Sequence, residues 1–406
     1  MATVPFSTPI GATCYVEPQP PPPPPPPTPD PPDPVVEPPP VVPPPTPDPV
    51  IIGEVIYVST INIAWQRGKV YQLLTGNYGT LQFGPGEASS NFVEIRGGNG
   101  VTVQGVAASK SYLKLTNLAI ANTRAATDTP YLLDLQPNVG YITLTDCTLY
   151  RPSNRYLGRG VYATRGGNHH LTFTRTTFRD MWGPFYYGIF DSDILFDGCS
   201  FLRNYSDPTT HSEGIDLNAS TRVTIKNCYF LDNNGTAFIV TLNRPSTYLY
   251  IFNNVFRHTW GAANSTGHGT ISDNTEAAKS ATSHHVYVHH NTFVDVAQYS
   301  GRSGITFWFG EDVVARNNLF YRCKKLAMLG VDDDYSAVFS CPASAEYTPA
   351  TNDVAYARDP FADADFRPDA EDGCVAGVAL DAAYNKDKDG RTRTRWYRGA
   401  YEGPAA

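Results

Sequence analysis

The feature that most constrains the fold is a six-residue phrase that recurs eight times and always ends in Ile, Leu or Phe. Each copy begins as an alternating apolar and polar strand, bends at a polar or glycine residue, and resumes with an apolar residue. Successive copies end 23 to 37 residues apart, a spacing that indicates a solenoid of stacked units. The copies are LTNLAI (115–120), LTDCTL (144–149), FTRTTF (173–178), FDGCSF (196–201), IKNCYF (225–230), IFNNVF (251–256), VHHNTF (288–293) and ARNNLF (315–320).

The strands are not separated by segments of helical period, so the crossover helices of a βαβ unit are missing. Successive coils must stack directly, at the strand spacing of about 4.8 Å. A further strand, Gly-aliphatic in most copies, precedes most phrases, as at Gly160-Val161, Gly188-Ile189, Gly214-Ile215, Ala237-Phe238 and Gly304-Ile305. The fold class predicted is therefore all-β, a parallel β-solenoid.

One position of the phrase, two residues before its end, predicts a column of like side chains stacked coil over coil. Its members are Leu118, Cys147, Thr176, Cys199, Cys228, Asn254, Asn291 and Asn318. This pattern resembles the right-handed parallel β-helix proteins, such as pectate lyases, polygalacturonases and phage tailspikes. The resemblance covers roughly residues 92–323. It is specific for the fold but weak for function, because proteins of unrelated function share this fold.

Composition divides the chain into four parts. Of the 35 prolines, 21 lie between Pro18 and Pro49, where they favour a stiff polyproline II stalk. Residues 1–17 precede the stalk as an anchoring segment. Residues 50–323 are predicted to form the β-helix. Residues 324–406, which end in the Gly-Ala-Tyr-Glu phrase seen after the last coil of many β-helix proteins, are predicted to form a C-terminal cap.

The net charge of −8 excludes the cationic surface that nucleic-acid binding requires. The chain lacks an apolar run of 18 residues, so no membrane insertion is expected. The first 17 residues carry no Lys or Arg and no apolar core of the kind an export signal needs. We therefore predict that the protein reaches the outside without a signal peptide.

The seven cysteines are scattered and form no CxxC motif, which argues against a zinc site. Three are predicted to be inert residues of the interior column: Cys147, Cys199 and Cys228. The pairing of Cys323, Cys341 and Cys374 is left open. Residues 385–390 begin like a calcium loop, but Trp396 stands where the bidentate Glu is needed, so a surface turn is the favoured interpretation. No metal site is predicted.

Glu213 and Asp216 are the candidate catalytic carboxylates, because glycoside hydrolysis needs one acid to protonate the leaving oxygen and one to activate water. His268 and Arg302 complete the candidate catalytic set. Residues 211–216, 233–235 and 267–269 follow one another in an order that resembles the polygalacturonases, with two departures. That family has an Asp-Asp pair where this chain has Asn233-Asn234, and its Arg-Ile-Lys phrase is missing here, with only Arg302 near the expected place.

A lyase is the alternative chemistry, with a Lys or Arg base that removes a proton next to a uronate carboxylate. Lys226, Arg244 and Arg302 are its candidates. No cofactor is predicted for the hydrolase, and calcium is the ion that a lyase would use. Whether the protein is an enzyme at all stays open.

Four aromatic residues between strands, Trp182, Tyr186, Tyr187 and Trp308, are candidate carbohydrate-binding groups. Aromatic rings stack on the apolar faces of sugars. Equally, such rings cover loops or form a contact between subunits. We expect the site on the outer face of the Gly-aliphatic strands, where alternation directs Glu213 and Asp216 towards solvent.

An anchor, a stiff stalk and a β-helix body together suggest a protein of the virion surface. The leading hypothesis is a spike or decoration protein, resembling phage tailspikes, that binds a host-surface polysaccharide and degrades it if the acids are catalytic. It would contact other virion proteins through residues 1–17 and assemble as a homotrimer. The alternatives are a free bacterial polysaccharide lyase or glycoside hydrolase, and a purely structural fibre subunit.

Overall fold

The computed structural model describes most of the chain from residue 55 to residue 402, all of it within one compact unit, Glu37–Ala406. The predicted anchor (1–17) and stalk (18–49) lie outside the described residues. The described residues are 55–84, 90–122, 131–151, 159–205, 213–233, 237–242, 244–259, 270–274, 283–296, 303–308, 310–361, 366–367 and 376–402.

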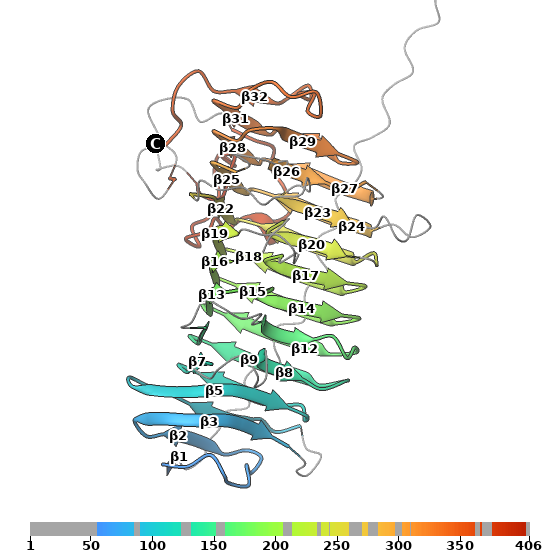
Figure 1. The fold of residues 1–406 in the computed structure, drawn as a ribbon. Coiled ribbons are helices and arrows are strands. Elements are labelled where there is room, and N and C mark those ends of the chain that lie inside the picture. Colours follow the sequence, from blue (N-terminus) through green and yellow to red (C-terminus); the bar gives the residue numbers. More distant parts are fainter. Residues whose placement is uncertain are drawn as a thin grey trace, which may run out of the picture. The chain divides into compact units, whose positions relative to one another are not determined.

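Parallel strands stack in chain order and form three faces, which we call the first, second and third face (Figure 1). The first face is a twelve-stranded sheet. Its strands are β1 (Val55–Val58), β2 (Val70–Leu73), β4 (Val93–Arg96), β6 (Leu113–Thr116), β9 (Gly140–Thr145), β12 (His169–Thr174), β15 (Ser192–Asp197), β18 (Thr221–Lys226), β21 (Thr247–Phe252), β24 (Ser283–His289), β27 (Gly310–Arg316) and β30 (Asp332–Asp334).

The second and third faces form one continuous sheet, because β3 (Gly76–Phe83) pairs with β5 (Val101–Ala108) and β5 pairs with strands of both faces. The second face contains β7 (Ala119–Ala121), β10 (Thr148–Tyr150), β13 (Thr177–Met181), β16 (Ser200–Asn204), β19 (Tyr229–Asn233), β22 (Val255–Arg257), β25 (Thr292–Val294), β28 (Leu319–Tyr321), β31 (Ala337–Phe339) and β32 (Val354–Ala355). The third face contains β8 (Tyr131–Leu135), β11 (Arg159–Ala163), β14 (Tyr186–Ile189), β17 (Ile215–Asn218), β20 (Ile239–Leu242), β23 (Ile271–Asn274), β26 (Ser303–Thr306) and β29 (Leu326–Leu329).

The recurring phrase forms the tight bend from the first face to the second. One residue in each bend has a positive φ, a conformation that Asn and Asp tolerate better than most residues. These residues are Asn117, Asp146, Arg175, Gly198, Asn227, Asn253, His290 and Asn317. The prediction of two strands joined by a bend is confirmed.

Stacked phenylalanines fill the interior. The ring of Phe201 lies 5.0 Å from Phe178 and 4.6 Å from Phe230, in both cases nearly parallel. The stack continues through Phe256, Phe293 and Phe320. Each of these rings is the last residue of a phrase, so the repeat seen in the sequence is the repeat of the core.

The predicted interior column is also present, next to the phenylalanines. All eight of its members are buried, including Cys147, Cys199 and Cys228. The asparagines extend it by hydrogen bonds between coils: the backbone N–H of Asn254 donates to Asn291 Oδ1, and that of Asn291 donates to Asn318 Oδ1, both at 3.0 Å. Each side chain therefore satisfies the buried backbone of the coil before it.

The C-terminal segment, residues 376–402, lies along the flank of the solenoid (Figure 1). Parallel pairing continues past residue 323 through β29, β30, β31 and β32. The segment then contacts the bends of earlier coils, from Asn227 to Asn317. Outward polar side chains at the bends thus bind these residues sideways, and a cap over the last coil stays a prediction.

The C-terminal segment contains one turn of 3₁₀ helix, η2 (Ala382–Tyr384). No helix in the described ranges is long and apolar enough to cross a membrane.

Candidate functional site

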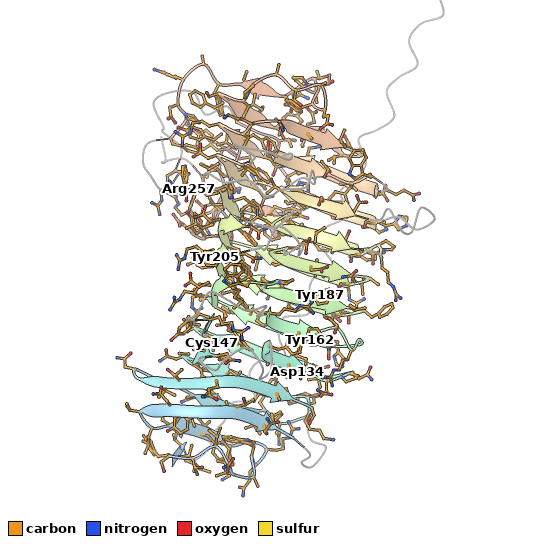
Figure 2. The ribbon with its side chains drawn as sticks, viewed as in Figure 1. Asp134, Cys147, Tyr162, Tyr187, Tyr205 and Arg257 are labelled. Atoms are coloured by element: carbon orange, nitrogen blue, oxygen red, sulfur yellow. The ribbon has the colours of Figure 1, made fainter. Side chains whose placement is uncertain are left out.

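The third face carries a column of polar and aromatic side chains in register. Asp134 of β8 pairs with Tyr162 of β11, Tyr162 with Tyr187 of β14, and Tyr187 with Asp216 of β17. Figure 2 shows Asp134, Tyr162 and Tyr187 in succession along this face. Four consecutive coils therefore present two acids with two phenol rings between them.

Arg159 connects the rings of this column. Its guanidinium carbon lies 5.4 Å from the centre of the Tyr162 ring and 4.6 Å from that of Tyr187, both within the range of a cation–π contact. Tyr131 stacks on Tyr162 with ring centres 3.8 Å apart. All four side chains are partly exposed, so the cluster forms a surface of phenol rings and one guanidinium.

Glu213 and Asp216 lie at the end of this column, and both residues are only 2% exposed. The prediction that they face solvent is therefore wrong. The side-chain amide of Asn204 donates to the Glu213 carbonyl at 2.9 Å, and that of Asn218 donates to Asp216 Oδ1 at 2.8 Å. The Glu213 charge acts on Asp216 and both charges act on Tyr187, so the two carboxylates lie close together next to Tyr187.

Burial raises the pKa of Asp216 well above its ordinary value, and the neighbouring Glu213 carboxylate raises it further. Arg159 and the Asn218 amide oppose this rise. Burial, followed by the charge of Asp216, raises the pKa of Tyr187 as well. The site therefore favours the protonated form of Asp216 more strongly than water does.

At the opposite end of the column, burial raises the pKa of Asp134 and the Arg165 guanidinium opposes the rise. The Arg165–Asp134 distance is 3.9 Å, and Arg165 also donates to the side chain of Gln136. Sequence reasoning missed Asp134, Arg159 and Tyr162. Alternation about the inward Val161 would have pointed to Tyr162 as an outward residue, but not to Arg159, which lies three positions earlier.

The four predicted aromatic residues do not form one surface. Tyr186 is fully buried and donates its hydroxyl to Asp191 Oδ2 at 2.6 Å, so it is a core residue and its assignment to sugar binding is wrong. Trp182 stacks on Tyr205 at 5.8 Å, beyond the ends of β13 and β16. Trp308 is 48% exposed and follows β26, four strands along the third face from Tyr187.

Two of the predicted catalytic residues, His268 and Arg302, lie outside the described residues, as do Asn234 and residues 267–269. The lyase candidates that are described lie elsewhere. Lys226 belongs to the first face and pairs with Asp197 at 3.3 Å, and the Arg244 guanidinium lies 4.6 Å from the Phe190 ring centre. Among described residues, the structure therefore assembles the acid pair and one arginine.

The described residues contain no group of three or more His, Cys, Asp or Glu side chains that could hold a metal ion. In the segment that resembles a calcium loop, protein donors already occupy Asp387. Its Oδ1 accepts from the backbone N–H groups of Asp389 and Arg391, and its Oδ2 accepts from Arg391 Nε and from Glu402 N. Asp387 thus organises a turn.

Comparisons with known proteins agree with this architecture. Residues 93–275 match the family model described as "Right handed beta helix region". A solved structure, "Crystal structure of pectate lyase Pel9A", superposes with a TM-score of 0.54 at 14% identity, covering 87% of this chain and 97% of that one. No curated protein sequence matches the chain. The described coils therefore have the right-handed parallel β-helix fold that the sequence pattern predicted.

Proposed function

We propose that the protein binds a polysaccharide along the third face, with the Asp134–Asp216 column as its contact surface. The observation that carries the proposal is the cluster of Arg159, Tyr162 and Tyr187 above a buried acid pair. Phenol rings offer stacking surfaces for sugar rings, and the guanidinium and carboxylates offer hydrogen bonds to hydroxyl groups. The pectate lyase of similar fold is an indirect support, because at 14% identity it shares the fold alone.

We further propose that the acid pair cleaves the bound chain by hydrolysis. Asp216, whose pKa burial raises, gives its proton to the leaving glycosidic oxygen, and Glu213 takes a proton from the attacking water. The bond between the anomeric carbon and the leaving oxygen breaks as the bond to the water oxygen forms. Since both carboxylates are buried, the site must open before the sugar can reach them.

Binding and cleavage are tested separately on a panel of neutral and acidic polysaccharides. We expect Tyr187→Ala and Arg159→Ala to weaken binding at least tenfold. Tyr248→Ala is the matched control, because Tyr248 is a partly exposed tyrosine of the first face that stacks on His285. Unchanged binding in both third-face variants would show that the site is elsewhere.

Asp216→Asn and Glu213→Gln test the chemistry, because they preserve shape while removing proton transfer. We expect reducing ends from the unmodified protein and a loss of at least a hundredfold in either variant, with binding retained. Unsaturated uronate absorbance in place of simple reducing ends would identify a lyase instead, and its loss on chelation would indicate calcium. Binding without any product would make the protein a glycan-binding subunit.

For the biological setting we propose a homotrimeric spike or decoration protein on a virion surface, with the N-terminal segment as the particle anchor. The proline-rich stretch ahead of a β-helix body supports this setting, because it would hold the body away from the particle. A light-scattering mass near that of one 44.5 kDa chain would contradict the trimer. Encoding among sugar-utilisation genes would favour a free bacterial enzyme, and a trimer that binds no glycan would favour a structural fibre.

A further inference from the structure

Two adjacent buried histidines, His289 and His290, lie where the C-terminal segment (residues 376–402) seats on the solenoid. His289 ends β24 on the first face, and His290 occupies the following bend with a φ of 53°. Both are 0% exposed. Because one points to the outer side of the sheet and the other outwards at the bend, they meet the segment at two different points.

His290 binds the segment only in its neutral form. Its Nδ1 lies 3.2 Å from the carbonyl oxygen of Tyr397, which accepts hydrogen bonds only, so Nδ1 carries the proton. Its Nε2 therefore accepts from Asn317 Nδ2, at 3.2 Å. The Asn317 amide cannot turn round, because its Nδ2 donates to the Val378 carbonyl at 2.7 Å and its Oδ1 accepts from Val378 N at 2.8 Å. A second proton on His290 would face an N–H donor.

His289 lies in an aromatic setting. The edge of its ring meets Tyr384 of η2, with ring centres 4.9 Å apart and planes at 90°, and Tyr287 lies 6.1 Å away. In the described part of the chain neither ring nitrogen has a hydrogen-bond partner, and the buried Tyr384 hydroxyl has none either. A contact with the Val288 backbone favours the charged imidazole, but burial opposes it more strongly, because a buried charge is strongly destabilising.

The charges around the two rings oppose protonation as well. The positive charge of Arg316 in β27 lowers the pKa of His289, and that of Arg393 in the segment lowers the pKa of His290. The nearest acids are engaged or remote: Glu402 pairs with Arg393 at 3.5 Å, and Asp381 acts on Tyr384. The other titratable neighbours, Tyr250, Tyr287 and Tyr384, are neutral phenols that supply no negative charge near neutral pH.

We propose that His289 and His290 form a pH-sensitive latch, which holds the C-terminal segment on the solenoid while both imidazoles are neutral and releases it when they take up protons. Release would uncover the outer side of β21 and β24. That surface carries Tyr250, Phe252 and Tyr287, which are 2%, 6% and 6% exposed beneath the segment. The latch is independent of the third-face site.

The direction of the pH effect follows from the two pKa values. Burial lowers the pKa of His289 to about 3, and burial lowers that of His290 well below its ordinary value. Once the segment is released, both histidines of the solenoid would titrate near 6.5. The seated state is thus fully stabilised above about pH 6.5 and loses stability as the pH falls below that value. At pH 5.0 each histidine favours release about thirtyfold, so the open fraction rises about a thousandfold relative to pH 7.5.

Hydrogen exchange of the full chain, corrected for intrinsic rates, measures this opening. We expect residues 376–402 to lose protection about a thousandfold between pH 7.5 and 5.0, while β4, β6 and β9 keep theirs. The double variant His289→Phe/His290→Gln should remove the effect, because Phe suits the apolar setting and Gln supplies one donor and one acceptor. His289→Phe alone should leave about thirtyfold.

The matched control is His284→Gln/His285→Gln, in the same strand. These histidines are partly exposed and face Glu311 and Asp312 at 3.2 and 3.5 Å. The control should keep the full pH effect on the segment. Equal protection of residues 376–402 at both pH values would overturn the latch. So would a pH effect that persists without His289 and His290, or one shared equally by β4, β6 and β9.

Discussion

The first face is one continuous sheet, yet its two halves present different outer surfaces. On β6, β9 and β12 the outward positions are Lys114, Thr143 and Thr172 in one column, and they line a polar cavity of about 570 Å³. In register with them, β21, β24 and β27 carry Tyr250, Tyr287 and Val314. The C-terminal segment covers the second half, so apolar side chains are stable there. The polarity of the outward residues therefore differs between the covered and the open half of the sheet.

The residue types of the interior column, from Leu118 to Asn318, change along the same axis. In the N-terminal coils its members are apolar residues, thiols and a hydroxyl, and Thr176 donates to the Leu144 carbonyl at 3.3 Å. In the C-terminal coils they are asparagines, each bonded on two sides. The C-terminal half therefore depends on more hydrogen bonds per coil than the N-terminal half.

The largest effect expected from this comparison is that of Tyr384→Ala. Tyr384 is fully buried between the segment and the first face, with its ring 5.0 Å from Phe252. Removing such a ring costs about 3–5 kcal/mol of unfolding free energy, measured by urea denaturation. Tyr384→Phe is the control and should be neutral or stabilising, because the hydroxyl has no partner among the described residues. A cost below about 1 kcal/mol for Tyr384→Ala would mean that the segment contributes little.

Asn291→Ala should have the next largest effect, about 3 kcal/mol. The substitution leaves the Ile251 carbonyl and the Asn254 N–H without their side-chain partners, and each unsatisfied buried group costs about 1–3 kcal/mol. Thr176→Ala, at the matching position of an N-terminal coil, should cost about 1 kcal/mol. Equal losses of unfolding free energy for the two variants, in thermal or urea denaturation, would remove the distinction between the two halves of the interior column.

The middle of the solenoid, where Asp191 precedes β15, and the C-terminal segment should respond to pH in opposite directions. Burial raises the pKa of Asp191 to about 7, while Tyr186 and Asn168 hydrogen bonds oppose the rise. Because its folded pKa lies above its unfolded value, this group stabilises most at low pH and the contribution is lost as the pH rises through about 7. From pH 5 to 8 the unmodified protein should lose roughly 2 kcal/mol that Asp191→Asn does not lose. Parallel pH curves for the two proteins would contradict this.

Sequence reasoning predicted the solenoid well because its signal is repeated. Each phrase combines a strand period, a bend residue and a core aromatic, so errors at one coil, such as Arg175 in a bend, do not hide the pattern. The same alternation identified the face of Glu213 and Asp216. It could not show that both are buried, because alternation tells which side of a strand a residue faces and not what packs over that side.

The site and the segment were harder to predict for a related reason. Arg159 reaches Tyr187 only because consecutive coils stack, and no short motif records that contact. The C-terminal segment binds Asn253 and Asn317, over 60 residues earlier, through backbone groups that any sequence possesses. Contacts made by backbone atoms leave no residue signature, so the sequence does not predict that this segment binds the flank of the solenoid.

The smallest effect expected is that of Thr145→Val on the open half of the first face. Thr145 lines the polar cavity and is partly exposed, and valine has nearly the same shape. A surface change of this kind alters unfolding free energy by at most about 0.5 kcal/mol. The substitution removes one partly exposed hydroxyl. A loss above about 1 kcal/mol in urea unfolding would instead mean that the hydroxyl is engaged in the folded protein, and that the N-terminal half of the face is covered as the C-terminal half is.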